Sequence, residues 1–426
     1  MSPQPRAEKV LRNIGQLLTM DPAAGGPGDA ARDPTAGLGL VLDAAVAMAG
    51  DRIVWVGREK DLKGQVDTEG ATVEDMGGRV VLPGLVECHT HTLFAGSRAQ
   101  EFARRVGGAS YEEILAAGGG IHSTVIATRQ ATLDTLVALG KERLDTFLSF
   151  GVTTVEIKSG YGLNLEDELK LLRAAAELAQ QHPVDVVPTC LGAHVMPAEH
   201  KKQRQVYIDM LCAELLPAVA EEGLARFCDV FVDSGAFSVK EAETILRRGL
   251  ELGMKPKMHA EQITRSGAIA LALELGAVSV DHLEKVTEED ARALADSKTV
   301  AVLLPGATYF LGRTDFAPGR MLADAGCKLA ISTDFNPGSC HSENLPLMLN
   351  MACLYNGIYP REALLGATRW AAAALDLDNE IGSLTPGRLA DLLILDTRDF
   401  RNLIYHFGVP MTHQVYKRGK TVWAQP

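Results

Sequence analysis

The stretch VVLPGLVECHTH, residues 80–91, is a nearly continuous apolar run that ends in His89 and His91. Such a run is typical of a strand buried on both faces, as in a parallel sheet. Because alternate residues of a strand point to the same side, both imidazoles can converge on one ion. The run therefore predicts half of a tetrahedral metal site, although an isolated pair is equally compatible with two polar residues at a strand end.

Seven further apolar runs follow, and helical stretches lie in most of the intervals between them. The runs are GVTTVEIKSG (151–160), VDVVPTCLGAH (184–194), FCDVFVDSG (227–235), KPKMHAE (255–261), VSVDHLE (278–284), KTVAVLLPG (298–306) and CKLAISTDFNPG (327–338). Residues 165–181 and 239–253 show the apolar spacing of amphipathic helices. Eight strand–helix units predict an α/β fold, a parallel (β/α)8 TIM-like barrel. Glu156 and Lys158 alternate with Ile157, which predicts a polar pair inside this barrel.

The two ends of the chain carry short strand-like segments instead of strand–helix units. We predict a small β-sandwich domain built from residues 1–81 and 382–426, beside a barrel formed by residues 82–381. Gly50 and Asp51 lie between two apolar runs and predict a hairpin turn. Residues 23–37 are rich in Gly, Pro and Ala, which predicts a surface loop.

The composition of the 426-residue chain is that of a globular protein, with 46% hydrophobic and 23% charged residues. The formal net charge of −12 argues against nucleic acid or an anionic membrane as a partner. We see no apolar segment long enough for a membrane span or signal peptide, and seven cysteines without a CxxC pair fit free thiols. We therefore expect a cytoplasmic protein that acts on a small molecule. Whether the protein forms a homodimer stays open.

Further metal-compatible residues stand at the ends of other predicted strands. They are His194, His259, His282 and Asp334. The active site of a barrel lies at the carboxyl ends of its strands, so all of these residues would share one mouth with the HxH pair. A single histidine is more often a hydrogen-bonded structural residue, but the whole set favours a metal-dependent enzyme.

This arrangement resembles the metal-dependent amidohydrolase superfamily, with HTH on the first strand, His on the fifth and sixth, and Asp on the eighth. More closely, the chain resembles the imidazolonepropionase family. The stretches that carry this resemblance are HTHTLFAGSRAQEF, YEEILAAGGGI, EIKSGYGLN, LGAHVMP, VDHLEK and STDFNPGS. It implies hydrolysis of 4-imidazolone-5-propanoate to N-formimidoyl-L-glutamate in histidine degradation, in which water opens a ring C–N bond.

The resemblance also implies the metal site, namely one Zn or Fe ion bound by His89, His91, His259 and Asp334. Two-metal relatives usually carry a bridging carboxylated Lys at the end of the fourth strand, and FCDVFVDSG has no Lys. Zinc lowers the pKa of water from about 15.7 to about 7, within reach of a positioned carboxylate. We expect Asp334 to shuttle the proton and His282 to hydrogen-bond the water or the developing oxyanion.

For the substrate, the family motif SRAQEF implies that Arg98 grips the propanoate carboxylate through two parallel hydrogen bonds. Tyr161 and His194 resemble ligand-binding residues of the family. The small residues that follow the strand-eight Asp would let backbone N–H groups approach the amino-acid end of the product. These residues are Asn336, Gly338 and Ser339.

The chain departs from many superfamily members that act on ring C–N bonds, which carry Glu three residues after the strand-five His. Gln262 stands there, and Glu261 precedes it. Because Gln cannot transfer a proton at neutral pH, we expect Gln262 to hydrogen-bond the substrate ring. Glu261 should point to the opposite face of the strand.

Two other functions compete with this interpretation. A purine or pyrimidine aminohydrolase of the same superfamily would release ammonia, but the missing Glu at position 262 disfavours it, and Arg98 would have no carboxylate to bind. A non-catalytic metal-binding or scaffold protein would keep its function after replacement of Asp334. Neither a P-loop nor a GxGxxG motif in a strand-to-helix context is found, which disfavours nucleotide cofactors.

Overall fold

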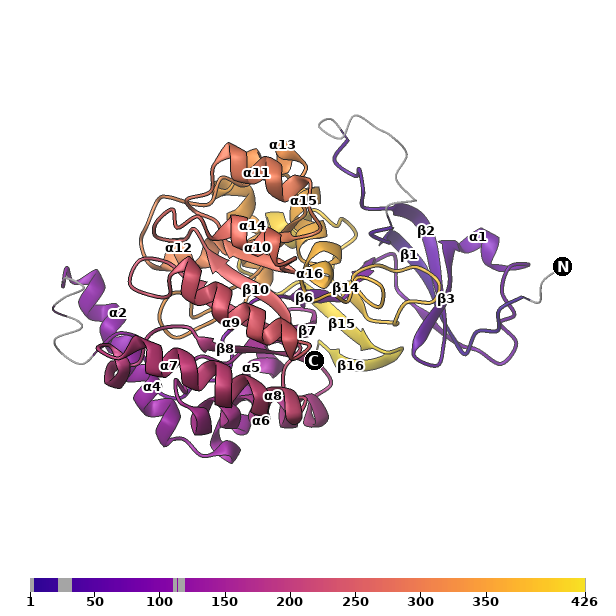
Figure 1. The fold of residues 1–426 in the computed structure, drawn as a ribbon. Coiled ribbons are helices and arrows are strands. Elements are labelled where there is room, and N and C mark those ends of the chain that lie inside the picture. Colours follow the sequence, from indigo (N-terminus) through magenta and orange to yellow (C-terminus); the bar gives the residue numbers. More distant parts are fainter. Residues whose placement is uncertain (1–3, 22–32, 110–112, 114–118, 426) are drawn as a thin grey trace.

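The computed structural model describes residues 4–21, 33–109, 113 and 119–425 (Figure 1). Of the predicted surface loop 23–37, only residues 33–37 are described, and they form a turn. Within the described parts of the chain, no helix has the length and apolar character needed to cross a membrane.

Eight parallel strands form one sheet in sequential order, and each of the eight predicted runs contributes one of them. The strands are β6 (Leu85–Glu87), β7 (Val152–Lys158), β8 (Asp185–Ala193), β9 (Phe227–Val232), β10 (Lys255–Ala260), β11 (Ser279–His282), β12 (Val300–Leu303) and β13 (Leu329–Ile331). Their side chains are buried almost throughout, because helices cover the outside while the strands face one another inside. The predicted (β/α)8 barrel is confirmed.

Helices lie around this sheet (Figure 1). They are α2 (Ala99–Val106), α4 (Ile121–Gln130), α5 (Leu133–Ser149), α6 (Leu165–Gln181), α7 (Arg204–Met210), α8 (Leu216–Glu221), α9 (Val239–Glu251), α10 (Ala268–Glu274), α11 (Glu288–Ala295), α12 (Pro305–Phe310), α13 (Gly319–Ala325), α14 (Leu345–Tyr355), α15 (Pro360–Gly366) and α16 (Arg369–Ala374), with the 3-10 helix η2 (Ala198–His200) and the π-helix η3 (Leu211–Leu215). Side-chain caps start the two predicted helices, Asn164 for α6 and Ser238 for α9.

The edge strands β6 and β13 meet just beyond their carboxyl ends. The backbone N–H of Asp334 donates to the carbonyl of His89 at 3.2 Å, and that of His91 donates to the carbonyl of Phe335 at 2.9 Å. The barrel is thus joined at the segments that carry the predicted metal ligands.

A second sheet is built from both ends of the chain and lies beside the barrel (Figure 1). Its order is β16-β15-β14-β5-β1-β2-β3, and β4 pairs with β1. The strands are β1 (Lys9–Leu18), β2 (Leu40–Ala49), β3 (Arg52–Arg58), β4 (Thr72–Asp75), β5 (Val80–Pro83), β14 (Leu392–Leu395), β15 (Thr412–Lys417) and β16 (Lys420–Ala424), with the short helices α1 (Glu59–Leu62) and α17 (Asn402–Tyr405). Strands β2 and β3 form the hairpin predicted at Gly50 and Asp51.

The stretch 80–91 belongs to both sheets, so the prediction of a single strand there is wrong. Strand β5 pairs with β1 and β14, whereas β6 pairs with β7 of the barrel. Gly84 separates them, and a Cβ at this position would lie 2.4 Å from the side chain of Thr153. Only glycine therefore lets the chain pass this close to β7 as it changes sheets.

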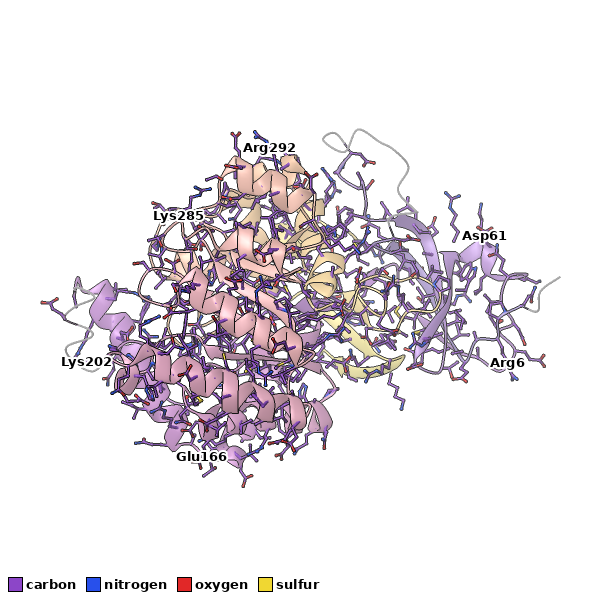
Figure 2. All side chains as sticks on the ribbon, viewed as in Figure 1. Arg6, Asp61, Glu166, Lys202, Lys285 and Arg292 are labelled. Carbon is purple, nitrogen blue, oxygen red and sulfur yellow. The ribbon has the colours of Figure 1, made fainter. Side chains whose placement is uncertain are left out.

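Charged side chains are mostly at the surface, as the exposed Glu166, Lys202 and Arg292 show (Figure 2). The barrel interior is different. It holds charged side chains that are almost completely inaccessible to solvent, including Glu156 and Lys158 of β7, whose carboxylate and ammonium lie 3.1 Å apart. The predicted polar pair is therefore present.

Candidate active site

A cavity of about 220 Å³ opens at the carboxyl ends of the barrel strands. Its lining includes nearly all of the predicted site residues, which are His91, Arg98, Tyr161, His194, His259, Gln262, His282, Asp334, Asn336, Gly338 and Ser339. His89 is absent from this lining because it is completely buried, although its ring lies beside those of His91 and His259. Residues scattered over most of the barrel sequence thus come together here.

Three imidazoles and a carboxylate converge beneath this cavity. His89, His91 and His259 each offer a nitrogen, and these atoms lie within 4.8 Å of one another. Oδ1 of Asp334 lies 3.5 Å from Nε2 of His89 and 3.5 Å from Nε2 of His91. Among the described residues, Nε2 of His89 and Nε2 of His259 find no hydrogen-bond partner despite their burial. Buried polar atoms of this kind are costly. Three nitrogens and one oxygen fit a single transition-metal ion.

Two of these histidines are held from behind by carboxylates. Nδ1 of His89 lies 2.7 Å from Asp281, and Nδ1 of His259 lies 3.1 Å from Asp229. When Nδ1–H donates to a carboxylate, Nε2 keeps its lone pair for an ion. Sequence reasoning missed both aspartates, and the available signal was a charged residue inside the apolar strands FCDVFV and SVDH.

The backbone turns sharply at two site residues. The φ angles of His282 and Asp334 are +86° and +55°, in the region that non-glycine residues rarely adopt. At the end of β11 this break ends the strand alternation, so Asp281 contacts His89 while the adjacent His282 lines the cavity. Strained backbone of this kind is concentrated at functional sites.

Burial sets the protonation of the site. It lowers the pKa of His89 and His91 well below the usual range. Burial, together with the neighbouring His259, lowers the pKa of His194 to about 3. Burial raises the pKa of Asp334, which makes this carboxylate more basic than an exposed one. The imidazoles of His89, His91 and His194 are therefore neutral and offer lone pairs at neutral pH.

His282 differs from the other histidines because Glu284 lies behind it, with Oε1 3.7 Å from Nδ1. Burial lowers the pKa of His282, but the negative charges of Glu284, Asp334 and Asp281 outweigh it, and the net shift is upward. A raised pKa favours the protonated form of this imidazole, in which both ring nitrogens donate hydrogen bonds.

The guanidinium of Arg98 is anchored at the cavity wall. Its Nε donates to Glu101 at 3.0 Å, and Nη2 pairs with the second carboxylate oxygen. Glu101 also accepts the backbone N–H of Gly120 at 2.8 Å. Nη1 lies against Gly338. Glu101 thus occupies the Nε edge, Nη1 faces the turn at Gly338, and Arg98 lines the cavity.

Tyr161 is held in a loop that a buried carboxylate organises. Glu168 accepts backbone N–H groups from Gly160 at 3.0 Å and from Gly162 at 2.7 Å. The Tyr161 ring lies 5.6 Å from that of His194. Nδ1–H of His194 donates to the carbonyl of Gly160 at 3.0 Å, which leaves Nε2 as an acceptor.

Gln262 and Glu261 lie in different environments. Gln262 lines the cavity. Glu261 is buried and accepts the backbone N–H groups of Ser266, Gly267 and Ala268 at 2.8–3.0 Å, so that it caps the start of α10. Its carboxylate is therefore used by the helix.

The turn after β13 differs from expectation in one respect. The N–H groups of Gly338 and Ser339 both donate to Oδ1 of Asn336 at 2.8 Å. They are thus satisfied within the turn and not free for a ligand. The Ser339 hydroxyl donates to Oδ2 of Asp334 at 3.1 Å, which orients that carboxylate.

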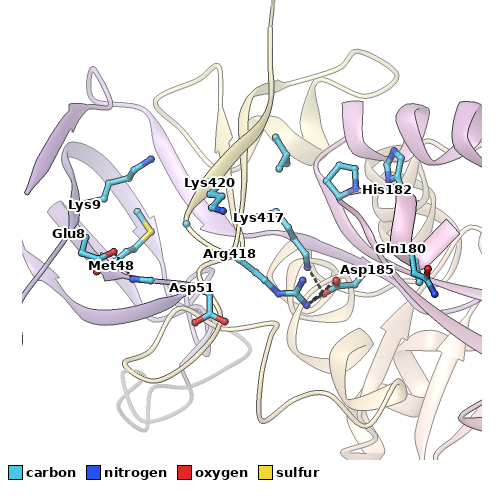
Figure 3. A pocket seen from close by; sticks show the side chains of 15 residues that line it. Glu8, Lys9, Met48, Asp51, Gln180, His182, Asp185, Lys417, Arg418 and Lys420 are labelled. Atoms are coloured by element: carbon cyan, nitrogen blue, oxygen red, sulfur yellow. Dashed lines mark hydrogen bonds and ion pairs between the residues drawn. The ribbon is translucent and has the colours of Figure 1, made fainter. Parts of the chain in front are cut away.

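A larger cavity of about 830 Å³ lies between the small sheet and the barrel (Figure 3). Two of its cations are engaged, since Asp185 pairs with Lys417 at 2.7 Å and with Arg418 at 3.0 Å. None of the predicted site residues lines it.

Comparisons with known proteins agree with these observations. Residues 80–422 match the model of the amidohydrolase family. The chain is 47% identical to an imidazolonepropionase from Symbiobacterium thermophilum, over 97% of this chain and 96% of the relative. It is 46% identical to one from Myxococcus xanthus, over 96% of each. Solved structures with the same fold include a zinc-bound adenosine deaminase from Xanthomonas campestris (TM-score 0.74, 18% identity, 99% of this chain and 94% of that one). Another is a 5-methylcytosine deaminase from Klebsiella pneumoniae (TM-score 0.73, 16% identity, 98% of each chain).

Proposed function

The chain belongs to the amidohydrolase family and, within it, to the imidazolonepropionases, and from this premise we propose that it hydrolyses 4-imidazolone-5-propanoate to N-formimidoyl-L-glutamate. The reaction cleaves a C–N bond of a cyclic amide. The observation that carries the proposal is the convergence of three buried imidazoles and one carboxylate at a cavity that also holds a guanidinium.

We assign one metal ion, Zn or Fe, to His89, His91, His259 and Asp334. The unpartnered Nε2 atoms of His89 and His259 support this assignment. When bound, the ion supplies Lewis acidity, which lowers the pKa of water toward about 7 and polarises the ring carbonyl. Zn and Fe both accept three imidazoles and a carboxylate, so the donor set supports either.

We assign proton transfer to Asp334. It takes a proton from the attacking water and delivers it to the ring nitrogen as the C–N bond breaks. Its raised pKa suits a group that must accept and then release a proton, and the Ser339 hydroxyl holds it in place. His282, whose pKa is also raised, donates a hydrogen bond to the oxyanion that develops on the ring carbonyl.

The remaining cavity residues orient the substrate. Arg98 binds the propanoate carboxylate. Nε2 of His194 accepts a hydrogen bond from a ring N–H, and the Tyr161 hydroxyl donates one. Gln262 hydrogen-bonds the ring. The turn of Asn336, Gly338 and Ser339 borders the end of the cavity next to Arg98.

The test is to incubate purified protein with 4-imidazolone-5-propanoate and follow the loss of its ultraviolet chromophore. Mass spectrometry should find a product heavier by one water, and no ammonia should be released. Ammonia release from a purine or pyrimidine would instead support the aminohydrolase.

We propose a cytoplasmic enzyme without nucleic-acid or membrane partners, in line with its net charge of −12. A homodimer remains a prediction that the mass in solution tests.

A further inference from the structure

We propose that Lys158 is a positioning residue that fixes two of the metal-binding histidines at once. The inference rests on the metal centre proposed above. It starts from five charged side chains inside the barrel that are almost fully buried, namely Glu156, Lys158, Asp229, Lys257 and Asp281. Charges without access to water are costly unless they are paired, so each contact among them matters.

Lys158 connects strands that are not neighbours. From β7, its Nζ lies 2.8 Å from Oδ2 of Asp229 on β9 and 3.5 Å from Oδ2 of Asp281 on β11. These are the second, fourth and sixth strands of the barrel. Alternate strands of such a barrel point their side chains into one layer, which explains how one ammonium reaches both carboxylates.

The same two carboxylates face the metal-binding histidines. Asp229 accepts from Nδ1 of His259 through Oδ1 at 3.2 Å, with its Oδ2 at 3.1 Å, and Oδ2 of Asp281 lies 2.7 Å from Nδ1 of His89. The ammonium therefore supports two parallel chains of ammonium, carboxylate and imidazole. Without it, both carboxylates would lose the cation that holds their oxygens at the imidazole nitrogens, and both rings would lose their fixed orientation.

A second cation site is the alternative explanation for this cluster, because Asp229, His259 and Asp281 offer ligand atoms within 4.8 Å of one another. The ammonium of Lys158 lies within 3.5 Å of both carboxylates and supplies the positive charge there. The cluster is therefore complete with Lys158, and we assign it to positioning.

Lys257 provides a matched control. It is also fully buried and lies on β10 in the same interior. Its Nζ pairs with Oε1 of Glu156 at 2.8 Å and donates to the carbonyl of Cys88 at 3.3 Å. In the described structure it makes no ion pair with Asp229 or Asp281. Lys257→Met thus removes a buried cation without removing the support of the two histidines.

The experiment compares full-length wild type, Lys158→Met and Lys257→Met. The affinity for Zn²⁺ is measured by competition with a chromophoric chelator, and the visible spectrum of bound Co²⁺ reports the ligand geometry. Lys158→Met should bind Zn²⁺ about 10–100-fold more weakly, the usual cost of losing outer support, and should change the Co²⁺ spectrum. Lys257→Met should resemble wild type in both. Equal behaviour of the two variants would overturn the inference.

A second set of variants covers the case in which Lys158→Met fails to fold. Asp229→Asn and Asp281→Asn each keep the side-chain shape and remove one charge. Because both carboxylates share one ammonium, their effects on Zn²⁺ affinity should be coupled, and the double variant should not show the product of the single losses. Strictly additive losses would contradict a shared support. A wild type that binds no ion would instead overturn the proposed function.

Discussion

A methyl group added at Gly338 would lie 2.0 Å from Nη1 of Arg98. The guanidinium therefore rests directly against the turn that follows β13. Because Glu101 holds the opposite edge, Arg98 is fixed between a carboxylate and a glycine at the cavity wall. A guanidinium that is already ordered loses little conformational freedom when it grips a carboxylate.

Gly338→Ala should displace Arg98 and weaken binding of the propanoate. We expect KM for 4-imidazolone-5-propanoate to rise about 10–100-fold, the usual value of charge-assisted hydrogen bonds, with a smaller change in kcat. Arg98→Ala should do the same. Steady-state kinetics with the acid and its methyl ester measure the effect, and Arg104→Ala on the exposed side of α2 is the control. Equal losses on acid and ester would reject the carboxylate contact.

Removal of the metal ion should abolish turnover and leave the barrel folded, because the apolar core does not depend on the site. Circular dichroism should therefore change little after dialysis against a chelator, while the thermal midpoint falls. A ligand at a thousandfold excess over its Kd stabilises the native state by about 4 kcal/mol, which sets the scale of that fall. Zn²⁺ or Fe²⁺ should restore activity. Full turnover of protein verified to be free of metal would refute this mechanism.

Tyr161 should act as a hydrogen-bond donor over the whole working pH range. Burial, reinforced by the charge of Asp334, raises the pKa of its phenol. A raised pKa of an acid extends its neutral form to higher pH, so the phenol stays protonated beyond pH 10. Tyr161→Phe should therefore raise KM about 2–10-fold, by the same factor at pH 7 and pH 9.5. A factor that shrinks toward one at pH 9.5 would mean that the phenol ionises.

Substitution of Gln262 should affect activity, whereas substitution of Glu261 should affect stability. Gln262→Ala should lower kcat/KM and leave the thermal midpoint unchanged, because the side chain faces the cavity. Glu261→Ala should cost about 1–3 kcal/mol of unfolding free energy, because three N–H groups at the start of α10, that of the buried Ala268 among them, lose their acceptor. Thermal melts and steady-state kinetics of both variants test these two expectations. The reverse pattern would make Glu261 the acid–base group.

Much of the fold could be predicted from the sequence, because strands buried on both faces leave long apolar runs. The split of residues 80–91 could not. An apolar run looks the same whether it pairs within the small sheet or within the barrel, and only the contact between Gly84 and Thr153 marks the change. A local sequence pattern therefore predicts that a strand forms, but it does not predict which strand it pairs with.

Part of the candidate site could likewise be predicted from the sequence, and part could not. Strand-end histidines and Asp334 could be predicted to share a cavity, because the carboxyl ends of parallel strands meet at one face. Asp229 and Asp281 could not be assigned, because their partners lie on other strands, His259 on the neighbouring β10 and His89 just beyond β6. Likewise, Asn336 satisfies the N–H groups of its own turn, which spacing alone does not reveal.

The junction between the first and last barrel strands has a consequence for biosynthesis. His89 leaves the ribosome early and Asp334 late, and the two meet where the first and last barrel strands are joined, through a backbone hydrogen bond and a 3.5 Å approach of their side chains. A nascent or truncated chain without the eighth strand thus lacks one of the four proposed metal ligands. Under the proposed assignment, an ion meets all four ligands only in molecules whose barrel has already closed.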